Sequence, residues 1–110
     1  MTQDLIDPSV FQELQEAMGE DFAAELLETF LSDADTMFAD LNTAATAGDT
    51  DAYRRASHSL KSNADTFGAR MMADHARAME LSGAIDVAAA TELKTTFDAT
   101  AQALKASSND

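Results

Sequence analysis

The chain has 110 residues, a length typical of one domain, and a chain of this size can bury a core without disulfides or metals. It carries 20 acidic against 7 basic residues, a net charge of -13 at pH 7, which argues against binding to nucleic acid or to an anionic membrane surface. It has no cysteine, no apolar run near the roughly 20 residues that span a bilayer, and no signal-peptide pattern at its start, so we expect a cytoplasmic protein.

Frequent alanine, one proline and four glycines favour helix throughout the chain. The first helix has Asp7 as its N-cap and Pro8 at its first position, and Gly19 ends it. Gly48 ends the second helix, and Asp49 can cap the third. The expected helices span residues 8–18, 20–47, 50–66, 69–81 and 87–106, followed by a frayed tail at 107–110.

Two further breaks separate the later helices. Gly68 lies between the third and the fourth, Ser82 and Gly83 open a turn, and Asp86 can cap the fifth. Long helices joined by short connections become antiparallel neighbours. The sequence therefore predicts a single all-α domain of residues 1–110, an up-down-up-down four-helix bundle with the short first helix covering one end.

Apolar residues recur at helical spacing and define the expected inner faces. Most of the six methionines lie in these stripes, so core packing explains them better than a ligand groove does. In chain order the expected inward residues are Val10, Leu14 and Met18; Phe22, Leu26, Phe30, Met37 and Leu41, with Leu27, Ala34 and Phe38 beside them; Tyr53, Ala56, Leu60, Ala64 and Phe67; Ala69, Met72, Ala76 and Met79; and Ala90, Leu93, Phe97, Ala101 and Leu104.

Charge is distributed unevenly along the chain. Every basic residue lies at Arg54 or later, whereas residues 1–53 are acidic and contain no lysine or arginine. One interpretation is a solvated acidic surface that keeps the protein soluble and monomeric. The other is an electric field that selects partners.

The third helix carries the one feature that core packing does not explain. His58 is two residues before Leu60, so it lies about 160° around the helix from the core stripe and points into solvent. The residues three or four positions from it are Arg54, Arg55, Lys61 and Ser62. Nearby positive charge disfavours protonation of the ring, which leaves a neutral nucleophile, and the same cations would stabilise a phosphoryl group attached to it.

A plainer interpretation of these cations stays open beside this one. The cations can form ordinary helix pairs, Asp51 with Arg54 or Arg55 and Asp65 with Lys61. The other histidine, His75, lies near the edge of the core stripe of its helix and has no acidic residue at metal-ligand spacing. We therefore interpret His75 as a boundary residue, and we expect neither a metal nor a cofactor.

The segment His58-Ser59-Leu60-Lys61-Ser62-Asn63-Ala64-Asp65-Thr66-Phe67-Gly68 resembles the signature of histidine-containing phosphotransfer (HPt) domains. That signature reads H-x-L-K-G, with an aromatic or aliphatic residue and then glycine further on. The resemblance extends over about residues 5–105, including the order and the lengths of the helices. Ser62 is a departure, because the family usually has glycine there, where it permits close approach of the partner.

The resemblance implies roles for several residues of the third helix and its end. His58 is the phosphorylated residue, on its Nε2 atom, and Lys61 stabilises the phosphoryl group. Arg54, Arg55 and Ser62 support the site, Leu60 is buried, and Gly68 ends the helix. The implied function is that of a phosphorelay intermediate, which exchanges phosphoryl groups with receiver domains and a hybrid or sensor histidine kinase, magnesium being held by the receiver.

The sequence argues against an ATP-dependent kinase. The four glycines fall at the helix breaks, and no phosphate-cradling glycine motif is present. Two alternatives remain: a non-catalytic helical module that docks a signalling partner without carrying phosphate, and a dimerising kinase-core bundle. The second would need a longer helical hairpin and usually an ATP-binding domain.

Overall fold

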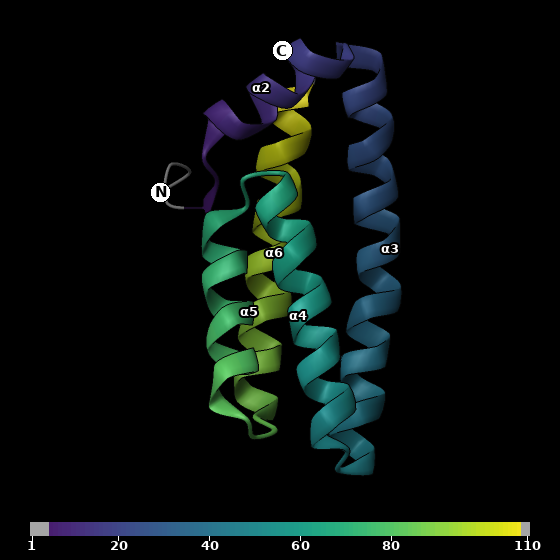
Figure 1. The fold of residues 1–110 in the computed structure, drawn as a ribbon, viewed down its shortest axis with the longest axis vertical. Coiled ribbons are helices and arrows are strands. Elements are labelled where there is room, and N and C mark those ends of the chain that lie inside the picture. The colour runs from purple at the N-terminus through teal and green to yellow at the C-terminus, as the bar shows by residue number, and fades with distance from the viewer. Residues whose placement is uncertain (1–4, 109–110) are drawn as a thin grey trace.

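A computed structural model describes residues 5–108, and within them the chain is all helical with no strand (Figure 1). Five helices follow one another along the chain. They are α2 (Pro8–Met18), α3 (Glu20–Ala47), α4 (Thr50–Thr66), α5 (Arg70–Ser82) and α6 (Val87–Ser108). The predicted all-α class is therefore confirmed.

The four longer helices lie side by side along the long axis of the molecule, and α2 lies across one end (Figure 1). Helix α4 contacts α3 and α5, and α6 contacts α5 and α3, so the four helices surround a common interior. Helix α2 contacts α3 and α6. The surface of α4 between α3 and α5 is left open to solvent.

The predicted helix caps are present. The Asp7 side chain accepts a hydrogen bond from the Ser9 amide at 3.1 Å, and Pro8 occupies the first turn. Asp49 accepts from the Ala52 amide at 3.0 Å, and Asp86 accepts from the Ala89 amide at 3.1 Å. Short polar residues placed just before each apolar stripe therefore fix where α2, α4 and α6 begin.

The bounds of the last two helices differ slightly from the expected ones. Helix α5 begins at Arg70 rather than at residue 69, because Ala69 has a ψ angle of 74°, outside the helical range. It ends at Ser82, and Gly83 follows with a φ of 69°. Helix α6 continues to Ser108, so residues 107 and 108 of the expected frayed tail are helical, whereas residues 109–110 lie outside the described part of the chain.

The predicted inner faces are correct for α4, for α5 and for most of α6, where Leu93 and Leu104 are fully buried. They are partly wrong for the first two helices. Met18 and Phe22 are 50% and 44% exposed, and Phe11 is buried in place of Met18. The buried face of α3 is centred on the residues expected at its side; its buried members are Ala23, Leu27, Phe30, Ala34, Phe38, Leu41 and Ala44.

The segment before α2 is anchored on the turn between α4 and α5. The Asp7 amide donates to the Gly68 carbonyl at 2.7 Å, and Ile6 is buried. Phe67 stacks on Phe30 with 4.9 Å between the ring centroids, which attaches the same turn to α3. The turn between α4 and α5 is therefore held from two sides.

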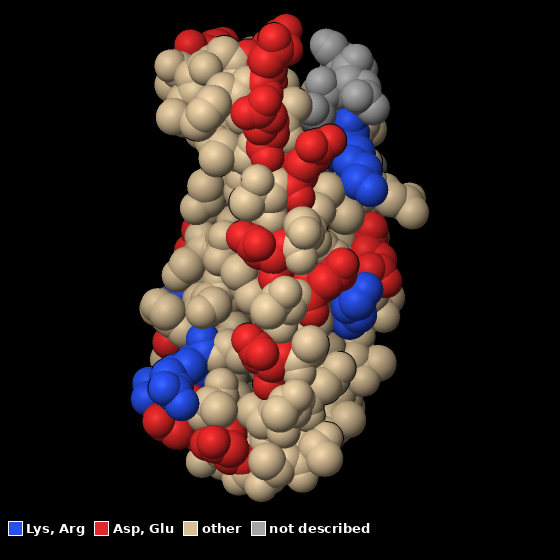
Figure 2. All heavy atoms as spheres, turned by 90° about the vertical axis from the view of Figure 1, so that its right-hand side faces the viewer, with Lys and Arg blue, Asp and Glu red and all other residues tan. Residues whose placement is uncertain are grey.

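Acidic side chains run along α3 on the face that Figure 2 shows. Helix α3 contains no lysine or arginine, and its exposed acidic residues are Glu20, Asp21, Glu25, Glu28, Asp33, Asp35 and Asp40. No helix within residues 5–108 is long and apolar enough to cross a membrane.

Candidate functional site

His58 lies on the outer surface of α4. Its side chain is 55% exposed, whereas Leu60 is completely buried, as the helical geometry predicts. The buried face of α4 also includes Tyr53, whose hydroxyl donates to the Asp86 carbonyl at 2.8 Å. Because α4 is held on its inner side in this way, the imidazole is presented on a rigid surface rather than on a loop.

Glu80 of α5 approaches the ring from the neighbouring helix. Its Oε2 atom lies 2.9 Å from Nδ1 of His58, and its Oε1 atom lies 3.2 Å from Nζ of Lys61. Glu80 and Lys61 are only 19% and 22% exposed, so the carboxylate lies between the two helices, partly screened from water. One carboxylate thus binds the histidine and the lysine of the predicted site together.

The charge state of Glu80 decides which ring nitrogen of His58 carries the proton. Partial burial disfavours its ionised form, but hydrogen bonds from Lys61 and His58, together with their charges, outweigh this and lower the pKa of Glu80 below its ordinary value. An ionised carboxylate can only accept hydrogen bonds. The proton of a neutral His58 ring therefore belongs on Nδ1, and the lone pair is on Nε2.

Arg54 and Arg55 are directed to a different partner. Asp51 accepts from Arg54 at 3.0 Å and lies 4.0 Å from Nε of Arg55. The hydrogen bond and the charge of Arg54 lower the pKa of Asp51. The two arginines therefore form the ordinary helix pairs that the sequence left open, and within residues 5–108 no hydrogen bond joins them to His58.

The pair of Lys61 with Asp65, which the sequence left open, does not form. Lys61 pairs with Glu80 on the next helix rather than with Asp65 on its own. The expected cluster of cations around the ring is accordingly replaced by a mixed site, in which a carboxylate touches the imidazole directly. This changes the expected electrostatics, because the nearest charge to His58 is negative.

The other predicted residues occupy the surface and the end of α4. Ser62 is exposed, and its carbonyl accepts from the Thr66 hydroxyl at 3.1 Å. Gly68 follows the end of α4 with a φ of 72°, a conformation that favours glycine. Gly68 therefore shapes the turn after the site and touches no part of it.

Glu80 is the residue that sequence reasoning did not assign to the site. Spacing along one helix cannot reveal a contact between residues 22 positions apart on two helices. The only available signal was an acidic residue next to the core stripe of a helix expected to pack beside His58.

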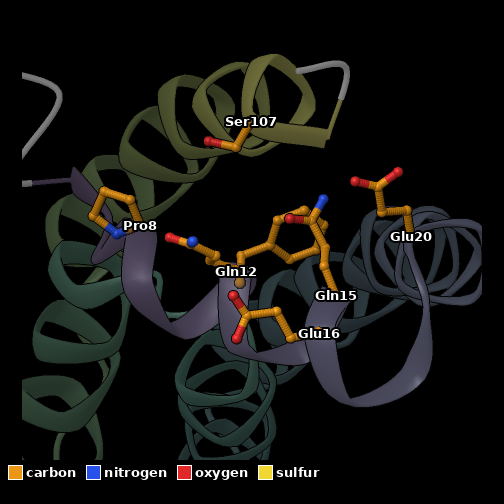
Figure 3. A pocket seen from close by; sticks show the side chains of 7 residues that line it. Pro8, Gln12, Gln15, Glu16, Glu20 and Ser107 are labelled. Carbon is orange, nitrogen blue, oxygen red and sulfur yellow. The ribbon is translucent and has the colours of Figure 1, made fainter.

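His75 is half-buried, as expected for a boundary residue, and its Nδ1 lies 3.3 Å from the hydroxyl oxygen of Thr96. Within the described chain, no group of three or more His, Cys, Asp or Glu side chains could hold a metal ion. A hollow of about 460 Å³ lies between α2, the start of α3 and the end of α6, and its lining contains none of the residues of the His58 site (Figure 3).

The sequence and the fold of this chain are both similar to those of known proteins. The family model described as Hpt domain matches residues 25–105, which include the whole His58 segment and Glu80. The chain belongs to the Hpt domain family. Proteins of this family are phosphotransfer carriers in signalling rather than kinases, and they work with receiver domains and histidine kinases.

A solved structure supports the same assignment. The crystal structure of histidine-containing phosphotransfer protein B (HptB) from Pseudomonas aeruginosa PAO1 is 29% identical and superposes with a TM-score of 0.88. The match covers 96% of this Hpt chain and 95% of HptB. No curated protein matches the chain.

Proposed function

We propose that this Hpt domain is a phosphorelay intermediate and that His58 carries the phosphoryl group on Nε2. It accepts the group from an aspartate of a receiver domain, or from a hybrid histidine kinase, and passes it to an aspartate of another receiver. The observation that carries the proposal is the Nδ1 contact of His58 with Glu80 at 2.9 Å, on an otherwise exposed ring. That contact leaves the Nε2 lone pair directed away from the protein.

The chemistry needs no proton transfer by this chain. The Nε2 lone pair attacks the phosphorus of the aspartyl phosphate, the P–O bond to the aspartate breaks, and the aspartate leaves as a carboxylate. The ring keeps its proton on Nδ1 and becomes positively charged, and Glu80 stabilises this charge. In the reverse direction the ring leaves as neutral imidazole, a better leaving group than the anion formed without the Nδ1 proton.

Lys61 supplies the positive charge at the site. Its ammonium group lies 3.2 Å from Glu80 and is attached one helical turn from His58. An ammonium on a flexible four-carbon chain can turn from the carboxylate to a phosphoryl oxygen, where it offsets negative charge. Arg54 and Arg55 are paired with Asp51, so we assign them a supporting role for the partner surface rather than for the phosphoryl group.

The partner provides the rest of the active site. We propose that the receiver holds the magnesium ion, which neutralises phosphoryl oxygens during the displacement. We also propose that the chain is a cytoplasmic monomer and that α3 to α6 form an antiparallel up-down-up-down bundle with α2 as its end cap. Short connections at Gly48, Gly68 and Gly83 support this topology.

Transfer from a phosphorylated receiver tests the proposal. Receivers are charged with acetyl phosphate and mixed with the wild type and with His58→Ala. We expect an acid-labile, alkali-stable phosphate on the wild type alone. Because His58 is exposed, the variant should still fold, with its unfolding free energy lowered by only about 1 kcal/mol through loss of the hydrogen bond to Glu80. Transfer to a folded His58→Ala variant would remove His58 from the proposal.

The alternative is a docking module that binds a signalling partner without carrying phosphate. It predicts binding to receivers with no labelling of His58 by any of a broad panel. The contact of His58 with Glu80 favours the carrier, because a docking surface has no need of an oriented imidazole.

A further inference from the structure

Ser62 lies one helical turn after His58 on the outer surface of α4, and both residues are exposed. Residues four positions apart on a helix have their Cβ atoms about 5–6 Å from each other. Side chains on a helix lean toward its N-terminus, so the Ser62 side chain leans back toward the turn that carries His58. The Ser62 hydroxyl therefore belongs to the immediate surroundings of the imidazole.

The hydroxyl of Ser62 is not committed to the backbone of its own helix. Ser57 and Thr66 of α4 donate their hydroxyl hydrogens to carbonyls four residues earlier, at 2.9 and 3.1 Å, as serine and threonine often do in helices. Within residues 5–108, no hydrogen bond involves the Ser62 hydroxyl; only the carbonyl of Ser62 is used, as the acceptor for Thr66. The folded protein therefore leaves this donor available beside the site.

Lys61 and Ser62 flank His58 on opposite sides. At 100° per residue, Lys61 lies about 60° from His58 in one direction around α4, and Ser62 lies about 40° in the other. Lys61 is on the side of α5, with which it forms an ion pair at 3.2 Å. Ser62 is on the side of α3, because the next residue, Asn63, contacts Met37 of α3 at 3.8 Å. A group attached to Nε2 thus has a cation on one side and a hydroxyl on the other.

A phosphoryl group has more acceptor atoms than Lys61 satisfies alone. It carries three oxygens that are strong hydrogen-bond acceptors, and the Lys61 ammonium already shares its hydrogens with Glu80. A hydroxyl that donates to an ionised oxygen forms a short bond, about twice as strong as one between neutral groups. A second donor beside the ring would therefore stabilise the phosphorylated form of His58, which alone contains the acceptor.

We propose that the Ser62 hydroxyl donates a hydrogen bond to a phosphoryl oxygen on Nε2 of His58, on the side opposite Lys61, and so holds the group on this protein. The inference rests on the proposed function for the presence of the phosphoryl group. The signature of the family has glycine at this position, which has no side chain to donate. The contact is therefore a property of this chain rather than of the signature.

The equilibrium of transfer tests the inference. A phosphorylated receiver is mixed with the wild type, Ser62→Ala, Ser62→Thr or Ser59→Ala, and the distribution of phosphoryl groups between the two proteins is measured before hydrolysis removes the label. Ser59 is the matched control, because it is also an exposed serine but lies one position from His58 and does not face the ring. We expect Ser62→Ala to lower the equilibrium constant about fivefold, which converts to about 1 kcal/mol.

The two other variants should keep the wild-type equilibrium constant, since Ser62→Thr retains the hydroxyl and Ser59→Ala leaves the site intact. This constant depends only on the free energies of the separate proteins, so a role of Ser62 in docking the receiver would not change it. An equal constant in the wild type and Ser62→Ala would overturn the inference. Equal losses in Ser62→Ala and Ser59→Ala would overturn it as well.

Labelling without any partner separates this inference from the proposed function. Phosphoramidate is the donor: Nε2 attacks its phosphorus, the P–N bond breaks, and the amine leaves as ammonia. Phosphorus NMR then follows the phosphohistidine. We expect one chemical shift and one lifetime for the wild type and Ser59→Ala, and in Ser62→Ala a different shift with loss of the label about fivefold faster.

The outcomes of the two experiments are independent. Equal shifts and lifetimes in the wild type and Ser62→Ala overturn the inference even where a receiver labels His58, and so does a His58 that phosphoramidate does not label. The expected difference supports the inference even where no receiver in a broad panel labels His58, a result that would count against the proposed function alone.

Discussion

Glu80 approaches His58 from the neighbouring helix and lies 2.9 Å from Nδ1 of its ring. The contact joins a largely screened carboxylate on α5 to an exposed imidazole on α4. A side chain that is exposed on a helix ordinarily samples several rotamers. This one is fixed at its inner nitrogen, so its outer nitrogen is presented in one direction before any partner arrives.

Removing the carboxylate tests whether it sets the tautomer. In Glu80→Gln, the side chain can donate or accept, so we expect a larger share of the ring with its proton on Nε2. Nitrogen NMR of the histidine ring measures this share. Transfer to His58 should slow by about 10- to 100-fold, the range for loss of a hydrogen bond to a charged group. Asp74→Asn, an exposed change on the same helix, should alter neither the tautomer nor the rate.

The same carboxylate predicts a pH dependence of stability. The pKa of Glu80 in the folded protein is below its ordinary value of 4.5, so its ionisation stabilises the fold above that pH. The contribution is lost as the pH falls through the lowered pKa. We expect the difference in unfolding free energy between the wild type and Glu80→Gln to shrink from pH 5 to pH 3. A difference that grew on acidification would mean that Glu80 is protonated in the folded protein.

Lys61 is expected to affect transfer less than His58 does. Lys61→Ala removes the one lysine or arginine that lies within ion-pair distance of Glu80 in the described chain. Single-turnover transfer should slow by about tenfold or more, because a charge-assisted contact with the phosphoryl group is lost. Lys61→Arg keeps the charge and should recover most of the rate. An unchanged rate in Lys61→Ala would exclude the lysine from the site.

Periodicity and capping residues were enough to predict the helices and the exposed position of His58. Each of these features is local, since it depends on residues within a few turns of one helix. The exposed Phe22 shows where apolar periodicity alone does not predict burial. Apolar spacing assigned it to the core stripe of α3, but which edge of a wide stripe is covered depends on the neighbouring helices, and these leave Phe22 near the α2–α3 junction uncovered.

The residue types of the site were predictable from the sequence, but the contacts between their side chains were not. The sequence placed three cations near His58, and the structure distributes them between Asp51 and Glu80. Pairing across helices depends on the rotation of α5 relative to α4, which the core residues of both helices set together. The contact of His58 with Glu80 therefore follows from the tertiary packing and not from the motif.

The glycine that follows the site provides the sharpest test of the fold. A Cβ atom on Gly68 would lie 2.7 Å from Cβ of Val10 and 2.8 Å from the Asp7 carbonyl oxygen, so the segment before α2 would have to move. Gly83 has a similar φ of 69° with nothing within 4 Å, which makes Gly83→Ala the matched control for backbone strain alone.

We expect Gly83→Ala to cost about 1 kcal/mol and Gly68→Ala at least about 2 kcal/mol more, because overlap in a packed region adds to the strain of a positive φ. Urea unfolding of both variants measures the difference. Since Gly68 touches no residue of the site, transfer to His58 should remain near the wild-type rate wherever Gly68→Ala is folded. Equal losses in the two variants would show that the turn does not hold the segment before α2.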